Sequence, residues 1–251
     1  RVASRAVVGE APRPIAVGLS GGADSLALTA ALVAEGHEVT ALCVDHGLQS
    51  GSAAQARRAA EQARGMGAAA EVVRVNVAKH GSLEAAARAA RYRAFADWGE
   101  VAVAHTTDDQ AETLLLGALR GRVTGMLERA EVEGARVLRP LLSVRRAQTV
   151  AACAELGLKV WHDPQNQDPA FRRVALRGDI LPRLAEIVGG DPVPALAQAA
   201  HDAALDHAYL RTPPTASCAE LAQLPEPKRR RAIAAWLREK GVEVTREAVR
   251  G

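Results

Sequence analysis

A glycine-containing string near the N-terminus has the residue types that bind phosphate. It reads Ser20-Gly21-Gly22-Ala23-Asp24-Ser25 and directly follows an apolar run at residues 15–19. Adjacent glycines let the backbone turn tightly and present its N–H groups to an anion, and a helix beginning there adds partial positive charge. The serine hydroxyls suit phosphate oxygens, and the Asp24 carboxylate suits either Mg²⁺ or a helix cap. A plain Gly-Gly turn is the alternative.

A second group of candidate residues is acidic and begins an expected helix over residues 108–119. Asp109 and Glu112 are three positions apart, so both carboxylates lie on one side of that helix. Such a pair suits a cationic amine, and Arg88 could hold a ligand carboxylate or steady the acid pair. The alternative is an acidic first turn that the helix dipole favours by itself. We expect Asp108 to be the cap of this helix.

Short apolar runs alternate with alanine-rich helical segments across the first 140 residues. Strands of this length separated by helices predict a parallel sheet covered on both faces, which right-handed crossovers make a doubly wound α/β domain. A site in such a sheet lies at the carboxyl ends of the strands. The expected strands are residues 15–19, 38–44, 71–77 and 101–104, and the expected helices are residues 25–35, 52–65, 82–98 and 108–119.

The second part of the chain has a different pattern. After Pro140 it indicates helices without convincing strands, at residues 144–156, 173–188 and 194–209. We therefore expect two units, a catalytic domain over residues 1–190 and a helical linker with the start of a small C-terminal domain over residues 191–251.

Composition limits the class of protein. The net charge is +3, 48% of residues are hydrophobic, and 24% are charged, as in ordinary soluble globular proteins. The sequence has no apolar stretch of 18 residues, so we expect a soluble cytoplasmic protein with no membrane partner. The oligomeric state stays open, a homodimer included. The three cysteines form no C-x-x-C pair, which argues against a disulfide framework or a zinc site.

The Ser20–Ser25 string lacks the lysine of a Walker loop and the spacing of the dinucleotide fingerprint. It resembles instead the PP-loop of the ATP pyrophosphatase superfamily, whose members cleave ATP between the α- and β-phosphates and adenylate a substrate. The resemblance implies an adenine nucleotide alpha hydrolase-like domain that binds ATP through Ser20, Gly21, Gly22, Ala23, Asp24, Ser25, Asp45 and His46.

Further strings narrow this resemblance. In order, and over roughly residues 14–185, they resemble the tRNA(Ile)-lysidine synthetases, also called synthases. The strings are Val44-Asp45-His46-Gly47-Leu48, Arg88-Ala89-Ala90-Arg91-Tyr92, residues 104–113 (AHTTDDQAET), Arg120-Gly121, Arg139-Pro140-Leu141-Leu142, Asp163-Pro164 with Asn166, and Arg173 with Arg177.

The resemblance implies a reaction and its participants. The family adenylates C2 of the wobble cytidine of a tRNA(Ile) with a CAU anticodon, and the side-chain amine of free L-lysine then displaces AMP. ATP and Mg²⁺ would be required, with Asp24 as the metal ligand. Arg88, Asp109 and Glu112 match the lysine-binding positions, and these three with Asp24 are the catalytic candidates. A neutral amine is rare at pH 7, so some group must accept a proton, and an acid of this cluster is the natural candidate.

Basic residues are dense between positions 136 and 183. Nine basic and four acidic side chains give this segment a local charge of about +5. A solvated helix face is the ordinary explanation, but the resemblance favours tRNA contact. The candidate RNA-binding residues are Arg145, Arg146, Arg173 and Arg177.

Three other functions compete with this one. A PP-loop enzyme that thiolates tRNA shares the activation step but needs reactive cysteines, which the spacing of Cys43, Cys153 and Cys218 does not favour. A PP-loop ligase acting on a small molecule would lack the basic segment. A catalytically inactive RNA-binding module would need neither the phosphate loop nor the acid pair.

Overall fold

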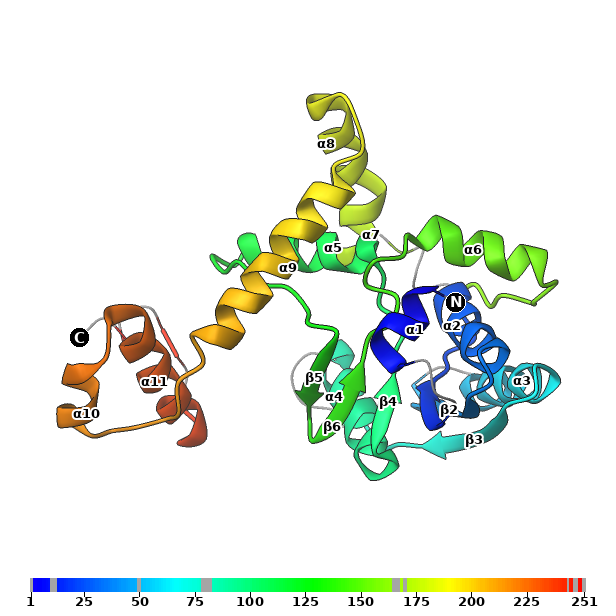
Figure 1. Ribbon diagram of the computed structural model, residues 1–251, viewed down its shortest axis with the longest axis horizontal. Coiled ribbons are helices and arrows are strands. Elements are labelled where there is room, and N and C mark those ends of the chain that lie inside the picture. The colour runs from blue at the N-terminus through cyan, green and yellow to red at the C-terminus, as the bar shows by residue number, and fades with distance from the viewer. Residues whose placement is uncertain are drawn as a thin grey trace.

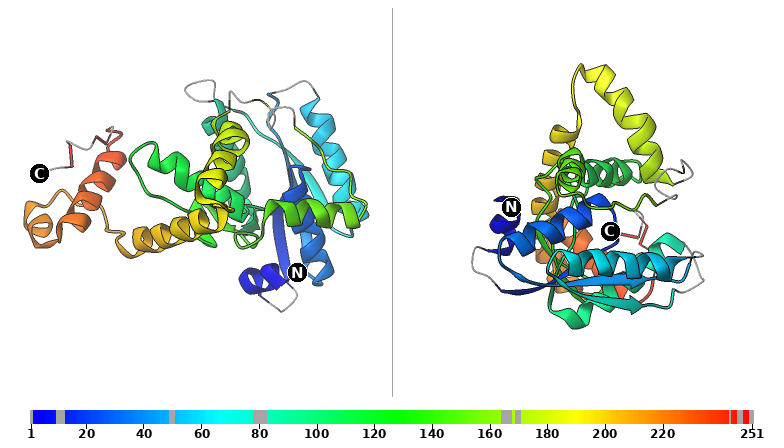
Figure 2. Two further views of the ribbon diagram at one scale, coloured as in Figure 1. Left: turned by 90° about the horizontal axis from the view of Figure 1, so that it is seen from above. Right: turned by 90° about the vertical axis from the view of Figure 1, so that its right-hand side faces the viewer.

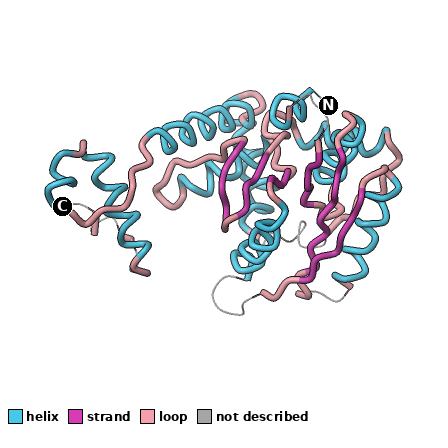
Figure 3. Tube along the Cα trace, turned by 60° about the horizontal axis from the view of Figure 1, so that its bottom comes forward, coloured by secondary structure: helices cyan, strands magenta, loops and turns pink. Residues whose placement is uncertain are grey.

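A six-stranded sheet forms the centre of the computed structural model, which describes residues 2–9, 13–48, 51–77, 83–163, 168, 171–242, 244–245 and 248–249. The strand order is β3-β2-β1-β4-β6-β5, and Figure 3 shows the strands in magenta between the helices. Neighbouring strands are parallel except that β5 runs antiparallel to β6. The strands are β1 (Pro14–Gly18), β2 (Glu38–Asp45), β3 (Ala69–Arg74), β4 (Glu100–Ala102), β5 (Arg129–Val132) and β6 (Ala135–Leu138). The predicted doubly wound α/β class is confirmed.

Helices cover both faces of this sheet, as Figure 2 shows. On one face, side chains of α1, α2, α3 and α6 pack with Val17 and Leu19 in the larger core. On the other face, Tyr92 and Phe95 of α4 meet edge to face at 5.9 Å and pack on β4. The bounds are α1 (Val2–Val8), α2 (Ala23–Ala34), α3 (Ser52–Gly65), α4 (Leu83–Phe95), α5 (Thr107–Ala118) and α6 (Arg146–Glu155).

The order of the strands places the functional loops together. β2 and β3 lie on one side of β1, whereas β4 and β6 lie on the other. The chain therefore leaves β1 and β4 in diverging directions, and a crevice opens at their carboxyl ends. The Ser20–Ser25 string follows β1 and helix α5 follows β4, so both begin at this crevice.

The sheet is larger than the sequence pattern predicts. The hairpin of β5 and β6 was not expected, and it turns through Glu133 and Gly134, whose φ angles are +51° and +81°. Two consecutive residues with positive φ make the tight turn that matches the twist of paired strands. Helix α1 was also not expected. Ser82, the expected start of the third helix, lies outside the described residues.

The remaining chain is helical. The expected helix at residues 173–188 is confirmed as a continuous helical segment, in which a π-helical turn (Leu176–Ile180) lies between α7 (Arg172–Ala175) and α8 (Leu181–Val188). Helix α9 (Val193–Tyr209) packs on α5 and leads away from the sheet to α10 (Cys218–Gln223) and α11 (Glu226–Glu239), as Figure 1 shows. The division into a catalytic domain over residues 1–190 and a second unit over residues 191–251 stays a prediction. None of the described helices is long and apolar enough to span a membrane.

Candidate active site

The Ser20–Ser25 string connects β1 to α2 at the carboxyl edge of the sheet. Gly21 has a φ of +87°, which glycine adopts without strain, and Gly22 is the N-cap of α2. The Ser25 hydroxyl closes the turn, because it donates to the Gly22 carbonyl at 3.0 Å and accepts from the Ser20 N–H at 3.3 Å. The first N–H groups of α2 are therefore presented at the crevice, where an anion can bind them.

The chain that follows α6 lies against this loop. The backbone N–H of Trp161 donates to the Gly21 carbonyl at 2.9 Å. Two residues earlier, Lys159 exchanges two backbone hydrogen bonds with the Gln62 side chain, each 2.9 Å long. The predicted site residues included neither Trp161 nor Gln62. Of the motif that follows, Pro164 and Asn166 lie outside the described residues.

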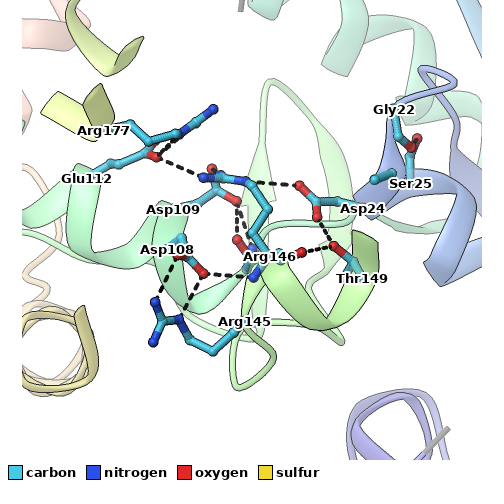
Figure 4. Close-up of polar contacts among 12 residues, drawn as sticks. Gly22, Asp24, Ser25, Asp108, Asp109, Glu112, Arg145, Arg146, Thr149 and Arg177 are labelled. Atoms are coloured by element: carbon cyan, nitrogen blue, oxygen red, sulfur yellow. Dashed lines mark hydrogen bonds and ion pairs between the residues drawn. The ribbon is translucent and has the colours of Figure 1, made fainter. Parts of the chain in front are cut away.

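Asp24, in the first turn of α2, is held by two residues of α6 (Figure 4). Its Oδ1 accepts a short hydrogen bond from the Thr149 hydroxyl, and its Oδ2 accepts from Arg146 Nε at 3.4 Å. Burial raises the pKa of Asp24, although Thr149 and Arg146 act in the opposite direction. Thr149 was not among the predicted site residues.

Asp109 has a structural bond on one oxygen and an ion pair on the other. Its Oδ2 accepts from both the backbone N–H and the hydroxyl of Thr106, at 2.8 Å each, which completes a capping box at the start of α5. Its Oδ1 lies 2.8 Å from Arg146 Nη2. Burial acts to raise the pKa of Asp109, but the charge of Arg146 and the hydrogen bonds from Thr106 outweigh it, so this pKa lies below its ordinary value.

The expectation that Asp108 caps α5 is wrong. Thr106 is the N-cap, so Asp108 points away from the free N–H groups of the helix and contacts α6 instead. Asp108 Oδ2 accepts from the backbone N–H of Arg146 at 2.8 Å and from Arg145 Nε at 3.2 Å. Asp108 therefore ties the start of α6 to the start of α5.

Glu112 is the buried centre of the acidic group, with 0% of its side chain exposed. Arg146 Nη1 lies 3.1 Å and Arg177 Nη2 lies 2.8 Å from its Oε1. Arg173 Nη1 lies 3.2 Å from its Oε2. A fully buried carboxylate needs such partners, because a lone charge would be far too costly to desolvate.

The four arginines that the sequence assigned to RNA all have carboxylate partners. Arg146, Arg173 and Arg177 contact the acidic group described above. Arg145 pairs with Asp108 and with Asp191 at the start of α9. Contact with RNA stays a prediction for these side chains, and any such contact would compete with or extend the ion pairs.

Arg88 lies on the exposed side of α4, with its guanidinium 4.9 Å from the centre of the Tyr92 ring. In the described part of the chain, the guanidinium groups bonded to the acid pair come from Arg146, Arg173 and Arg177. The acid pair is therefore steadied by arginines of α6, α7 and the π-helical turn, and not by Arg88 as one of the two suggested roles had it.

Asp45 and His46 end β2 on the same edge of the sheet. Asp45 Oδ1 accepts from the Ser52 hydroxyl at 2.6 Å and from the Gly47 N–H at 3.0 Å, and the Ser52 bond is the main cause of a lowered pKa at Asp45. Burial and the charge of Arg91 lower the pKa of His46 to about 4. Its Nδ1 is buried without a hydrogen-bond partner among the described residues.

Comparison with known proteins identifies the family. A model described as a PP-loop domain matches residues 3–184. The chain is 52% identical to a tRNA(Ile)-lysidine synthase of Corynebacterium glutamicum, over 91% of this chain and 76% of that protein. Synthases of Corynebacterium diphtheriae (54% identity, 98% and 82% covered) and Rhodococcus erythropolis (47%, 93% and 77%) are similarly related. The chain belongs to the tRNA(Ile)-lysidine synthase family. It is therefore a ligase-type, ATP-using enzyme of the PP-loop group.

One solved structure supports the fold of this synthase family member. A U34-tRNA thiolase of Methanococcus maripaludis, solved with its [4Fe-4S] cluster, matches with a TM-score of 0.62 and 17% identity, over 79% of this chain and 76% of that one. The two buried thiols of the present chain, Cys43 and Cys153, differ from reactive cysteines. Burial raises the pKa of Cys43 to about 11 and also raises the pKa of Cys153, while Cys218 lies on the separate helix α10.

The surroundings of Asp24 suit a metal ion that takes most of its ligands from substrate and water. In the described ranges, no three His, Cys, Asp or Glu side chains are grouped so as to hold a metal ion by themselves. Mg²⁺ commonly uses one or two carboxylates and takes its other oxygens from substrate phosphates and water. A single carboxylate beside a phosphate-binding loop meets that requirement.

Proposed function

We propose that this synthase family member joins L-lysine to the wobble cytidine of a tRNA(Ile) with a CAU anticodon. In the first step, the C2 oxygen of the cytidine attacks the α-phosphorus of ATP, and pyrophosphate leaves. In the second step, the side-chain amine of lysine attacks C2, the bond from C2 to the AMP oxygen breaks, and the amine loses its extra proton. The products are lysidine, AMP and pyrophosphate.

The observation that carries this proposal is the position of one guanidinium. Arg146 contacts Asp24 beside the PP-loop and also Asp109 and Glu112 of α5. The phosphate-binding and amine-binding halves of the site are therefore separated by no more than one side chain. The second step requires such proximity, because the amine must reach the carbon that carries AMP.

The PP-loop residues have the first role in this scheme. The backbone of Gly21, Gly22 and Ala23 and the hydroxyls of Ser20 and Ser25 would bind the phosphates, with Asp45 and His46 beside the adenosine. Asp24 would hold Mg²⁺, which supplies positive charge against the leaving pyrophosphate. The N-terminus of α2 acts on the same charge.

The acid pair has the second role. The lowered pKa of Asp109 keeps its carboxylate charged near neutral pH, which suits binding of an ammonium group better than acceptance of its proton. Glu112 provides a second, buried charge beside it. Arg88 is available from α4 for the carboxylate of the amino acid.

The tRNA would approach over the helical half of the site. Arg145 is partly exposed, as are Arg173 and Arg177, with 32%, 36% and 38% of their side chains accessible. Each can reach a phosphate while the buried part of its stem stays in place. We also propose, from the sequence, that the protein is cytoplasmic and that it can form a homodimer.

The test uses ATP labelled at the α-phosphate, labelled lysine and a CAU-anticodon tRNA. Formation of AMP and attachment of lysine should both require the tRNA. Asp109→Asn should keep tRNA-dependent pyrophosphate release but lose lysine attachment at least tenfold at limiting lysine. The matched control is Asp202→Asn, because the Asp202 carboxylate lies on α9 and accepts a hydrogen bond at 2.9 Å from Gln198 of the same helix. Adenylation without lysine attachment in the unaltered chain would favour another nucleophile, as in a thiolase, and no AMP at all would contradict the enzyme assignment.

A further inference from the structure

The guanidinium of Arg146 fills the position between the carboxylates. Its Nη2 lies 2.8 Å from Asp109 Oδ1, its Nη1 lies 3.1 Å from Glu112 Oε1, and its Nε lies 3.4 Å from Asp24 Oδ2. Figure 4 shows this side chain reaching across the site from the start of α6. Each of the three guanidinium nitrogens thus lies against a carboxylate oxygen.

The formal charges of this group balance only while Arg146 is present. Asp24, Asp109 and Glu112 carry −3, and the three bonded guanidiniums carry +3, which leaves no net charge for a further cation. Without Arg146, and with no Mg²⁺ at Asp24, the remaining Arg173 and Arg177 leave a net charge of −1. That deficit equals the charge of one ammonium group.

The side chain of Arg146 can leave without moving its helix. Its backbone N–H donates to Asp108 Oδ2 at 2.8 Å, and this bond anchors the start of α6 independently of the guanidinium. The side chain retains 21% exposure and lies next to solvent-accessible Arg145. Part of the side chain is therefore already accessible to solvent, while its backbone is held by a bond that does not involve the guanidinium.

We propose that Arg146 is an internal competitor for the lysine-binding carboxylates, so that L-lysine binds only when its ammonium group displaces this guanidinium. The inference rests on the proposed function, because it takes Asp109 and Glu112 as the amine-binding pair. Arg146 is then a specificity-determining residue rather than a catalytic one.

Displacement explains how the site would reject simple cations. A bare monovalent cation offers the carboxylates no more than Arg146 already supplies. An amino acid that also binds through its α-amino and α-carboxyl groups has additional binding energy with which to move the equilibrium. Selectivity for a complete amino acid follows from competition within the site.

The decisive experiment measures the equilibrium binding of L-lysine to the full chain by titration calorimetry. Arg146→Gln removes the charge and keeps a polar side chain of similar reach. It should lower the Kd for lysine about tenfold or more, which corresponds to an open form that makes up about a tenth or less of the free protein. Arg146→Lys keeps a competing cation and should stay within about threefold of the unaltered Kd. General damage to the site cannot produce tighter binding.

Arg13→Gln is the matched control, because Arg13 is also a partly buried arginine, paired with Glu100 at 2.9 Å at the opposite end of the sheet. Its Kd for lysine should be unchanged. An unchanged or higher Kd in Arg146→Gln, together with loss of binding in Asp109→Asn, overturns the competitor role and leaves the proposed function standing. If Asp109→Asn binds lysine as well as the unaltered chain, the amine site itself is wrong.

A second measurement on the unaltered chain covers the case in which Arg146→Gln does not fold. In protein labelled with ¹⁵N-arginine, the Nε–H resonance of Arg146 is assigned by its absence in Arg146→Lys. Saturating L-lysine should shift this resonance and speed its exchange with water, whereas L-norleucine, which has an α-ammonium group but no side-chain ammonium group, should not. A resonance that is unaffected at saturating lysine contradicts the proposal.

Discussion

The backbone N–H of Trp161 donates to the carbonyl of Gly21 at 2.9 Å, so the segment after α6 is bonded to the PP-loop 140 positions earlier. Helix α6 itself holds Asp24 through Thr149 and Arg146. The phosphate loop is therefore supported from two sides by one continuous stretch of chain. A displacement of α6 on lysine or tRNA binding would therefore change the hydrogen bonds that support this loop.

Gly21→Ala should destabilise the protein and impair ATP use. A residue with a side chain pays about 1–2 kcal/mol in the left-handed region where Gly21 lies, and the new Cβ would come within 2.8 Å of Gln55 Nε2. Urea unfolding should show this loss, and the KM for ATP should rise. Gly22→Ala is the control for stability, since Gly22 has a φ of −75° and its Cβ would meet its nearest neighbour, Ser20 Oγ, at 3.6 Å. Equal stability of the two variants would contradict the strained geometry.

Glu112→Gln should lower the free energy of unfolding by about 3 kcal/mol, because it removes the buried countercharge that three guanidiniums share. Glu112 has no exposed side-chain surface and pairs with Arg146, Arg173 and Arg177. The control is Glu186→Gln, where the ion pair with Arg183 is 65% exposed on the acid side and should contribute less than about 1 kcal/mol. Chemical denaturation of both variants in parallel measures the difference. A loss as small in Glu112→Gln as in the control would mean that the arginines find other partners.

The sequence predicts the half of the site that depends on local pattern. The strand, glycine turn and helix around Gly21 follow from residue types within a dozen positions, and the common face of Asp109 and Glu112 follows from helical spacing. The Thr106 cap was also visible in principle, because a threonine three positions before an acidic residue is a capping-box pattern. The prediction that Asp108 is the cap did not take this pattern into account.

The other half of the site depends on tertiary packing. Nothing local distinguishes Arg146, which enters the acidic group, from its neighbour Arg145, which pairs at the surface with Asp191. Only the position of α6 against α2 and α5 decides between them. The hairpin of β5 and β6 escaped prediction for a local reason, because its Glu133-Gly134 turn lacks the asparagine or aspartate that usually signals such turns.

Gly125→Ala should disrupt the packing of the loop after α5 on α9. A Cβ on Gly125 would lie 1.9 Å from the backbone carbonyl oxygen of Ala200, and a backbone atom within a helix cannot move aside cheaply. Overpacking of this kind costs about 1–3 kcal/mol or more, which thermal or urea unfolding will detect. Gly65→Ala, within α3 and with nothing within 4 Å of its Cβ, should instead gain about 0.5–1 kcal/mol. Tolerance of Gly125→Ala would show that α9 is not held against this loop.

The stability of the protein should fall as the pH drops from 7 to 5, and His105 should account for part of the loss. Burial lowers the pKa of His105 to about 3, with Arg139 adding to the effect and Asp109 opposing it. An unfolded histidine has a pKa of about 6.5, so below that pH the unfolded chain binds a proton that the folded chain refuses. This linkage removes about 2 kcal/mol of stability between pH 7 and pH 5. His105→Gln, which keeps an acceptor for the 3.3 Å bond from Arg139 Nε, should reduce the pH-dependent loss by that amount in urea unfolding at the two pH values. An unchanged difference would mean that His105 takes up a proton in the folded protein at pH 5.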